Sequence, residues 1–208
     1  MQRLGARSIP IVSRGDKFVF AQVIKDVVEF LGIDEDTGPK LSPQQLGDRY
    51  LSILDKAIEQ TRLMPDEHLT KELPNRPRSW LVLLHHVFQI PNAFVDMEDT
   101  GEALSYENMV GPPPADMTTS AAIAKFGEDT KARFAKWCDK AKSEDFSGQV
   151  PTYFGGTTRH EMLERTVWHS TQHVRQVGAL LAEVGVTPPN PVTAADIDGL
   201  PLTDKVWG

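Results

Sequence analysis

Two histidines, His169 and His173, lie four residues apart in a segment whose apolar residues recur with the period of a helix. Four residues of α-helix advance the chain by about 6 Å and turn it by about 400°, so both imidazoles leave the same face one turn apart. Two nitrogens placed in this way can bind one metal ion at about 2.0–2.1 Å. The spacing therefore indicates a metal site, and the alternative is a pair of solvated histidines on a helix surface.

The apolar side of this predicted helix favours the metal site. It is formed by Leu163, Val167, Val174, Val177 and Leu181. His169 and His173 flank this face, so we expect their rings to point toward the interior of the protein or its rim. Imidazoles in such a place need polar partners or a metal ion.

A third ligand is expected from an earlier apolar segment, residues 83–88, which contains the adjacent histidines His85 and His86. Neighbouring helical positions are about 100° apart, so only one of the two can face a given point. The residues alone leave the choice between them open. The alternative interpretation is one core histidine and one exposed histidine without a metal ion.

The remaining histidines and the nearest carboxylates are not predicted to be ligands. His160 starts the same helix half a turn out of phase with His169, and His68 lies in a polar segment where we expect it to be solvated. Glu161 and Glu164 sit about 80° and 140° around the helix from His169. An exposed position is predicted for both, and the alternative is a carboxylate that reaches the site as the partner of a ligand.

Four long helices are predicted to carry these residues, because apolar side chains recur at spacings of three and four from residue 42 onward. The predicted helices begin after Ser42, at residues 78–79, at residues 118–119 and at about residue 158. The second is predicted to end near residue 97, with a kink at Pro91, and the fourth near residue 183. The fold class is therefore mainly α, a four-helix bundle.

Three segments outside these helices have their own patterns. An irregular stretch leads to Gly111 and three prolines, residues 150–156 suggest a small hairpin or lid, and the tail from residue 187 is predicted to be extended. Tyr153, in the glycine-flanked hairpin, is a candidate pocket residue.

The first 33 residues differ from the rest. Short β-branched segments flank Gly15, and an amphipathic segment then ends at Gly32, which predicts a hairpin and one helix. We therefore expect a small N-terminal ββα appendage over residues 1–33, a linker over 34–41 and the helical domain over 42–208. A hairpin and one helix cannot enclose a core of their own.

Bulk composition narrows the range of partners. The chain has 208 residues, 40% of them hydrophobic, and a net charge of -7. It has no basic stripe of the kind a general nucleic-acid binder needs, so no nucleic-acid partner is expected. No apolar segment approaches a membrane span or a secretory signal, so no membrane partner is expected. The single cysteine, Cys138, excludes an intrachain disulfide and suits a reducing compartment, which makes the cytoplasm the predicted location.

The histidine pattern resembles that of the DinB family of metal-binding four-helix bundles, which includes bacillithiol transferases and resembles mycothiol-dependent isomerases. In that family a helix opens with Trp-Ser, a histidine follows seven residues after the serine, and a later helix carries His-x-x-x-His. Here His86 follows Ser79 by seven residues, and Arg175 and Gln176 follow His173. The likeness covers about residues 42–208. Two departures are that Arg78 stands at the tryptophan position and that Trp80 follows the serine.

The resemblance implies three histidine ligands, His86, His169 and His173, around a divalent ion of Ni, Zn, Fe or Mn. It also implies coordination positions left for water or substrate, and a homodimer. Such a centre lowers the pKa of a bound water or thiol. The resemblance does not identify catalytic residues, and these stay unknown.

Residues 1–33 resemble the last third of a glutaredoxin, part of a thioredoxin fold. Residues 5–10 match the segment that ends in that family's cis-proline, and residues 15–20 match the strand that follows. The part of a glutaredoxin that carries the active-site cysteines is absent from this chain. We therefore expect no thiol redox activity from these residues.

The two resemblances together suggest a metal-dependent thiol S-transferase that joins a low-molecular-weight thiol to an electrophile, or a related hydrolase or isomerase. The alternative is a non-catalytic, stress-related dimer that binds a metal ion or a ligand. A substrate-sized pocket beside a bound metal ion would favour the enzyme, whereas a closed coordination shell would favour the binding protein. A plain helical scaffold would require all three histidines to be incidental.

Overall fold

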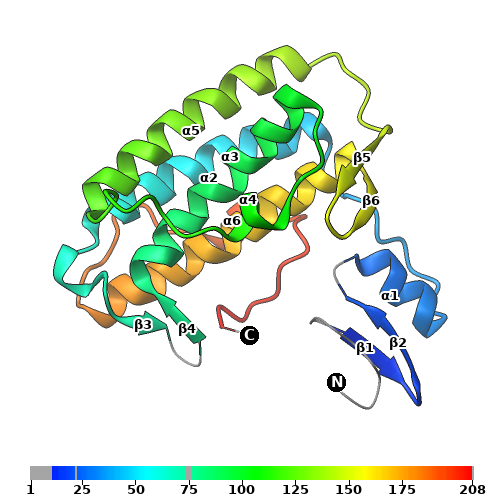
Figure 1. The fold of residues 1–208 in the computed structure, drawn as a ribbon, viewed down its shortest axis with the longest axis horizontal. Helices are drawn as coiled ribbons and strands as arrows, with labels where there is room; N and C mark the ends of the chain where they lie inside the picture. Colours follow the sequence, from blue (N-terminus) through cyan, green and yellow to red (C-terminus); the bar gives the residue numbers. More distant parts are fainter. Residues whose placement is uncertain (1–10, 22, 74–75, 208) are drawn as a thin grey trace. The chain divides into compact units, whose positions relative to one another are not determined.

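The computed structural model describes residues 11–21, 23–73 and 76–207 (Figure 1). The protein is mainly helical. It divides into two compact units, Met1–Gly38 and Pro39–Gly208, and the division falls within the segment predicted as a linker.

The first unit contains the hairpin and helix that the sequence predicts. Strand β1 (Ile11–Arg14) pairs antiparallel with β2 (Lys17–Phe20), and helix α1 (Ile24–Leu31) follows. Gly15 in the turn and Gly32 at the end of α1 have φ values of 64° and 68°, which glycine adopts without strain. None of the described residues of this unit is buried. The likeness to a glutaredoxin stays a prediction, and its matched residues 5–10 lie outside the described residues.

Four long helices make up most of the second unit. They are α2 (Pro43–Leu63), α3 (Trp80–Thr100), α5 (Ser120–Ala141) and α6 (Arg159–Glu183). Helices α2 and α3 each pack against both α5 and α6, and all four lie side by side in Figure 1.

Hydroxyl side chains begin all four helices at or next to the predicted positions. Ser42, Ser79, Thr119 and Thr158 each accept a hydrogen bond from a backbone N–H in the first turn. These bonds satisfy donors that a helix start leaves without a partner. The predicted starts and the predicted end of α6 are confirmed. Helix α3 continues past residue 97 to Thr100 and ends at Gly101, whose φ is 71°.

Shorter elements connect the long helices. They are the 3-10 helix η2 (Asp66–His68), the hairpin β3 (Glu72–Leu73) and β4 (Arg76–Ser79), α4 (Tyr106–Val110), the hairpin β5 (Gln149–Thr152) and β6 (Gly155–Thr158), and α7 (Ala194–Ile197). The hairpin predicted at residues 150–156 is confirmed.

Two segments predicted to be irregular or extended contain helical turns. Helix α4 forms because Ser105 accepts a hydrogen bond from the backbone N–H of Asn108. Helix α7 lies in the tail, where Asp196 caps its start and forms an ion pair with Lys56 of α2 at 2.7 Å. The prediction of a wholly extended tail was therefore wrong at α7.

The core lies between the four long helices and is rich in aromatic residues. The largest fully buried side chains include Tyr50, Trp80, Phe88, Phe94 and Phe134. The rings of Tyr50 and Phe134 meet edge to face at 5.0 Å, an arrangement that aromatic pairs favour. This core sets the separation of the helices that carry the histidines.

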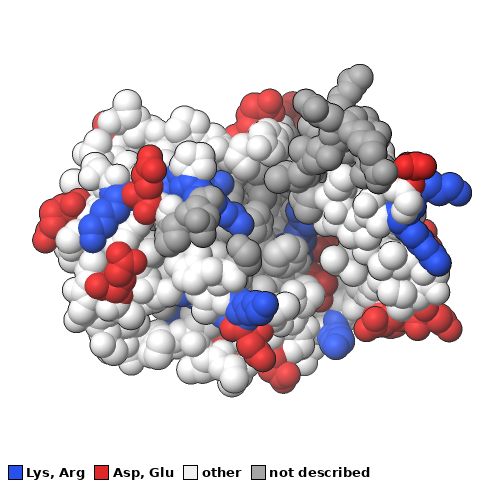
Figure 2. Space-filling model, turned by 90° about the horizontal axis from the view of Figure 1, so that it is seen from below, with Lys and Arg blue, Asp and Glu red and all other residues white. Residues whose placement is uncertain are grey.

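The face shown in Figure 2 carries both basic and acidic side chains. Basic and acidic side chains are interspersed there among the described residues, without a single broad basic area. No helix in the described part of the chain has both the length and the apolarity that crossing a bilayer requires. The absence of nucleic-acid partners stays a prediction.

Candidate metal centre

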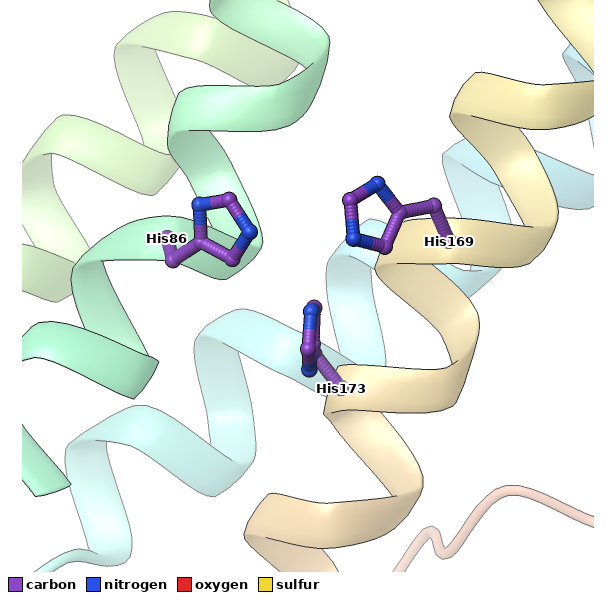
Figure 3. A group of neighbouring side chains, drawn as sticks. All are labelled: His86, His169 and His173. Atoms are coloured by element: carbon purple, nitrogen blue, oxygen red, sulfur yellow. The ribbon is translucent and has the colours of Figure 1, made fainter. Parts of the chain in front are cut away.

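Three histidine rings from two helices meet between α3 and α6. The ring of His86 lies 5.4 Å from that of His169 and 5.0 Å from that of His173, and the last two rings are 5.0 Å apart. One nitrogen from each ring lies within 4.8 Å of the other two. Figure 3 shows the three rings turned toward one another, one from α3 and two from α6. The residues predicted from the sequence are thus brought together.

A hydrogen bond between the two helices fixes their register beside the histidines. Pro91 has no backbone N–H, so the carbonyl of Val87 lacks the donor that an α-helix normally supplies four residues later. The Ser170 hydroxyl donates to this carbonyl at 2.9 Å. Val87 follows His86 and Ser170 follows His169, so this bond joins the immediate neighbours of two ring-bearing residues. Helix α3 runs through Pro91 without a break because a partner helix satisfies the freed carbonyl.

Burial leaves ring nitrogens in the cluster without hydrogen-bond partners. His86 and His173 are 3% and 7% exposed, and His169 is partly buried. Among the described residues, neither Nε2 of His173 nor Nδ1 of His169 has a hydrogen-bond partner. A buried polar atom without a partner costs about 1–3 kcal/mol, and a metal ion bound to Nε2 of His173 would remove that cost. The donor set fits a divalent ion such as zinc.

Two glutamines contact the other side of the rings. Nδ1 of His86 lies 3.3 Å from Oε1 of Gln89, and Nδ1 of His173 lies 2.8 Å from Oε1 of Gln176. An imidazole whose Nδ1 is bonded in this way presents Nε2 to the centre of the cluster. Gln89 was not singled out from the sequence, and Gln176 was named only as part of the family's pattern, without a role at the imidazole. A signal was present, because each of the three histidines is followed three residues later by glutamine, the third being Gln172 after His169.

The surroundings keep the three rings neutral. Burial lowers the pKa of His86 to about 3, and His173 and Arg78 act in the same direction. Burial also lowers the pKa of His173 to about 4, with the charges of Arg78 and Arg76 adding to the effect. The pKa of His169 lies well below its usual value, again chiefly because of burial. Neutral imidazoles retain the lone pairs that metal binding needs.

His85, the other candidate for the third position, faces away from the cluster. Its ring stacks on Phe126 of α5 at 5.2 Å, with 16° between the ring planes. Both His85 and His86 are buried, so the interpretation with one of them exposed is wrong. Helix geometry therefore separates the neighbours as expected, with only His86 directed toward α6.

The other excluded histidines lie outside the cluster. Nε2 of His160 is 2.8 Å from the carbonyl oxygen of Leu41, which agrees with its exclusion. His68 is partly buried, and its ring lies 6.0 Å from that of Trp80. The prediction of a solvated His68 was therefore wrong.

Glu161 and Glu164, the carboxylates of α6 nearest to His169, are partly buried instead of exposed, which corrects the sequence prediction. Glu161 closes the capping box of α6 and accepts hydrogen bonds from both the backbone and the hydroxyl of Thr158. Burial raises the pKa of Glu164 to about 7. Neither is in the group of side chains that the structure brings together for a metal ion.

Tyr153, the candidate pocket residue, lies between β5 and β6 and is 38% exposed. Its side chain is hydrogen-bonded with Arg165, whose guanidinium lies 4.5 Å from the centroid of the Phe154 ring. The charge of Arg165 also contributes to the lowered pKa of His169. The β5–β6 hairpin is therefore linked to the histidine cluster through one arginine.

The fold and the cluster define a class of helical protein in which three histidines from two packed helices meet in a buried group. The family model described as the DinB family matches residues 52–198, and this match includes all three histidines. The match covers well over half of the chain, so the protein belongs to the DinB family. Comparison with curated proteins gave no match.

Proposed function

We propose that His86, His169 and His173 bind one divalent metal ion through their Nε2 atoms. The observation that carries this proposal is the convergence of three neutral ring nitrogens within 4.8 Å of one another. The buried Nε2 of His173, which has no hydrogen-bond partner among the described residues, supports it independently. We further propose that α2, α3, α5 and α6 form the four-helix bundle of the family. The identity of the metal among Ni, Zn, Fe and Mn, the homodimer and the cytoplasmic location stay predictions.

The reaction that we propose is the transfer of a low-molecular-weight thiol to an electrophile. Three protein ligands leave coordination positions free, and a divalent ion bound there would lower the pKa of a thiol. In the reaction the thiol loses its proton to solvent, and its sulfur forms a bond with the electrophilic carbon. The leaving group then departs with its electron pair.

The chain itself does not offer the reacting thiol. Burial raises the pKa of Cys138, its only cysteine, to about 12, so this residue is a poor nucleophile at neutral pH. We therefore propose a thiol from a small molecule. The likeness of residues 1–33 to a thiol-handling protein supports this choice of substrate. Tyr153 is proposed as a residue of the substrate pocket because of its link to His169 through Arg165.

The first test is the metal content of protein purified without an affinity tag, measured by elemental analysis beside the His169→Ala variant. We expect about one metal ion per chain in the parent protein and little in the variant. The second test is conjugation of 1-chloro-2,4-dinitrobenzene to glutathione, cysteine and coenzyme A. We expect activity in the metal-loaded parent protein and its loss in His173→Ala.

Each result has a distinct meaning. Parent protein without metal would overturn the proposed site. Bound metal without conjugation of any thiol would overturn the transferase and favour the non-catalytic metal- or ligand-binding dimer. Equal conjugation by the parent protein and His173→Ala would show that the activity does not depend on this cluster.

A further inference from the structure

Two of the three histidines are held by the same arrangement, in which a glutamine joins the imidazole to a backbone carbonyl outside the helices. Oε1 of Gln89 accepts a hydrogen bond from Nδ1 of His86. Nε2 of the same amide donates a hydrogen bond to the carbonyl of Gly111 at 3.1 Å. In the same way, Oε1 of Gln176 accepts a hydrogen bond from Nδ1 of His173, and its Nε2 donates one to the carbonyl of Val206, also at 3.1 Å. The two arrangements come from different helices and end on different segments.

The backbone carbonyl at the far end fixes the hydrogen that each imidazole carries. A carbonyl oxygen can only accept a hydrogen bond, so it must face the NH₂ group of the amide. The amide oxygen therefore faces the imidazole, and Nδ1 must carry the hydrogen that this oxygen accepts. Nε2 is then left with its lone pair, directed at the centre of the cluster.

The carbonyls themselves are held in place. Gly111 ends α4, and three prolines that restrict the backbone follow it. The segment that carries Val206 is bound along α6, where Arg175 donates to the carbonyls of Thr203 and Asp204 and Gln172 donates to that of Val206. The acceptors are thus held by contacts that do not involve the three histidines.

We propose that Gln89 and Gln176 are positioning residues of the metal centre, and that the backbone at Gly111 and Val206 belongs to the centre through them. This inference rests on the proposed metal site. Groups that bond the second nitrogen of a metal-bound histidine fix its tautomer and orientation, and their loss commonly weakens metal binding by about 10–100-fold. The carbonyls of Gly111 and Val206 therefore act on metal affinity only through the amides that they orient, and they supply no ligand.

Gln172 provides a matched control. It stands three residues after His169, as the other two glutamines stand to their histidines. Its amide is directed elsewhere, because its Nε2 donates to Val206 and its Oε1 accepts from Arg175 at 2.8 Å. The Nδ1 atom of His169 has no hydrogen-bond partner among the described residues. Removal of Gln172 therefore disturbs the same segment without touching a bond to an imidazole.

The experiment measures Zn²⁺ affinity by competition with a chelator, and the absorption spectrum of bound Co²⁺, in full-length protein. We expect affinity to fall about 10–100-fold in Gln89→Leu and in Gln176→Leu, with an altered Co²⁺ spectrum. Gln176→Glu should keep clearly more affinity than Gln176→Leu, because either oxygen of a carboxylate accepts from Nδ1 and no carbonyl is needed to orient it. Gln172→Leu should lose clearly less affinity than Gln176→Leu, because Arg175 still holds the segment that carries Val206.

The outcomes separate this inference from the function on which it rests. Parent protein that binds no Zn²⁺ would overturn the metal site itself. A parent protein that binds Zn²⁺ while both leucine variants bind equally well would overturn the positioning role alone. Thermal unfolding of each metal-free variant provides the structural control. If Gln176→Glu loses as much affinity as Gln176→Leu, an acceptor at Nδ1 of His173 does not determine the affinity and the positioning role of Gln176 is wrong.

Discussion

At the scale of single residues, His85 and His86 show how one helical step separates two roles. His86 points toward the rings on α6, whereas His85 stacks on Phe126 of α5. The sequence alone left the choice open, because the run around them is apolar on every side. Only the family pattern, in which a histidine follows the serine by seven residues, favoured His86 over His85. The direction of each side chain is settled by packing against two different helices, which a single sequence does not reveal.

This separation leads to a test with a matched pair of variants. His86→Gln is expected to abolish metal binding, because it removes one of three ligands. His85→Gln is expected to keep one metal ion per chain, because it removes only a ring packed against Phe126. Metal content after dialysis and elemental analysis distinguishes the two. Loss of metal in His85→Gln alone would mean that the third ligand has been misassigned.

The roles of the glutamines beside the imidazoles could not be predicted for a related physical reason. The spacing of glutamine three residues after each histidine is visible in the sequence, but the three amides behave differently. Gln89 and Gln176 contact imidazoles, while Gln172 bonds to Arg175 and to the C-terminal segment. The direction of each amide depends on backbone carbonyls that are far away in the sequence, so the spacing alone does not predict it.

At the scale of elements, helix starts were predictable because they depend on nearby residues. A serine or threonine that caps the first turn is a local signal, and all four long helices use one. Helix α7 also begins with a local signal, the capping box of Thr193 and Asp196, but its four residues are too few to show an apolar period. The end of α3 at Gly101 also has a local signal, a glycine that adopts a positive φ.

The contact between α3 and α6 yields a prediction at this scale. Ser170→Ala removes the donor to the Val87 carbonyl and leaves that buried group without a partner, so it is expected to lower the free energy of unfolding by about 1–3 kcal/mol. In a Pro91→Ala background the new backbone N–H can satisfy the same carbonyl. Ser170→Ala should then lower the free energy of unfolding by a clearly smaller amount.

Urea unfolding of the parent protein, both single variants and the double variant measures this coupling as a double-mutant cycle. Equal costs of Ser170→Ala in the two backgrounds would show that Ser170 does not replace the donor that Pro91 removes.

At the scale of the whole molecule, the neutral histidine cluster makes the stability of the metal-free protein depend on pH. The folded pKa values of His86 and His173, about 3 and about 4, lie below the value of about 6.5 expected in an unfolded chain. Between about pH 6.5 and pH 4 the unfolded chain therefore binds protons that the folded protein does not. The contribution of these neutral histidines to the free energy of unfolding is fully present above this range and is lost as the pH falls through it.

We expect the free energy of unfolding to fall on the order of 1 kcal/mol per pH unit for each buried histidine in this range. Denaturant unfolding of metal-free protein from pH 7 to pH 4 measures the slope. The triple variant with glutamine at residues 86, 169 and 173 should show a smaller slope. An unchanged slope in that variant would mean that other groups cause the acid sensitivity.

The most direct measurement is anomalous X-ray scattering from crystals of the metal-loaded protein, with data collected on both sides of the metal absorption edge. We predict one strong anomalous peak between α3 and α6, at about 2.0–2.2 Å from a ring nitrogen of His86, His169 and His173. No peak at this position, or a bound ion held by other side chains, would contradict the assignment of the centre.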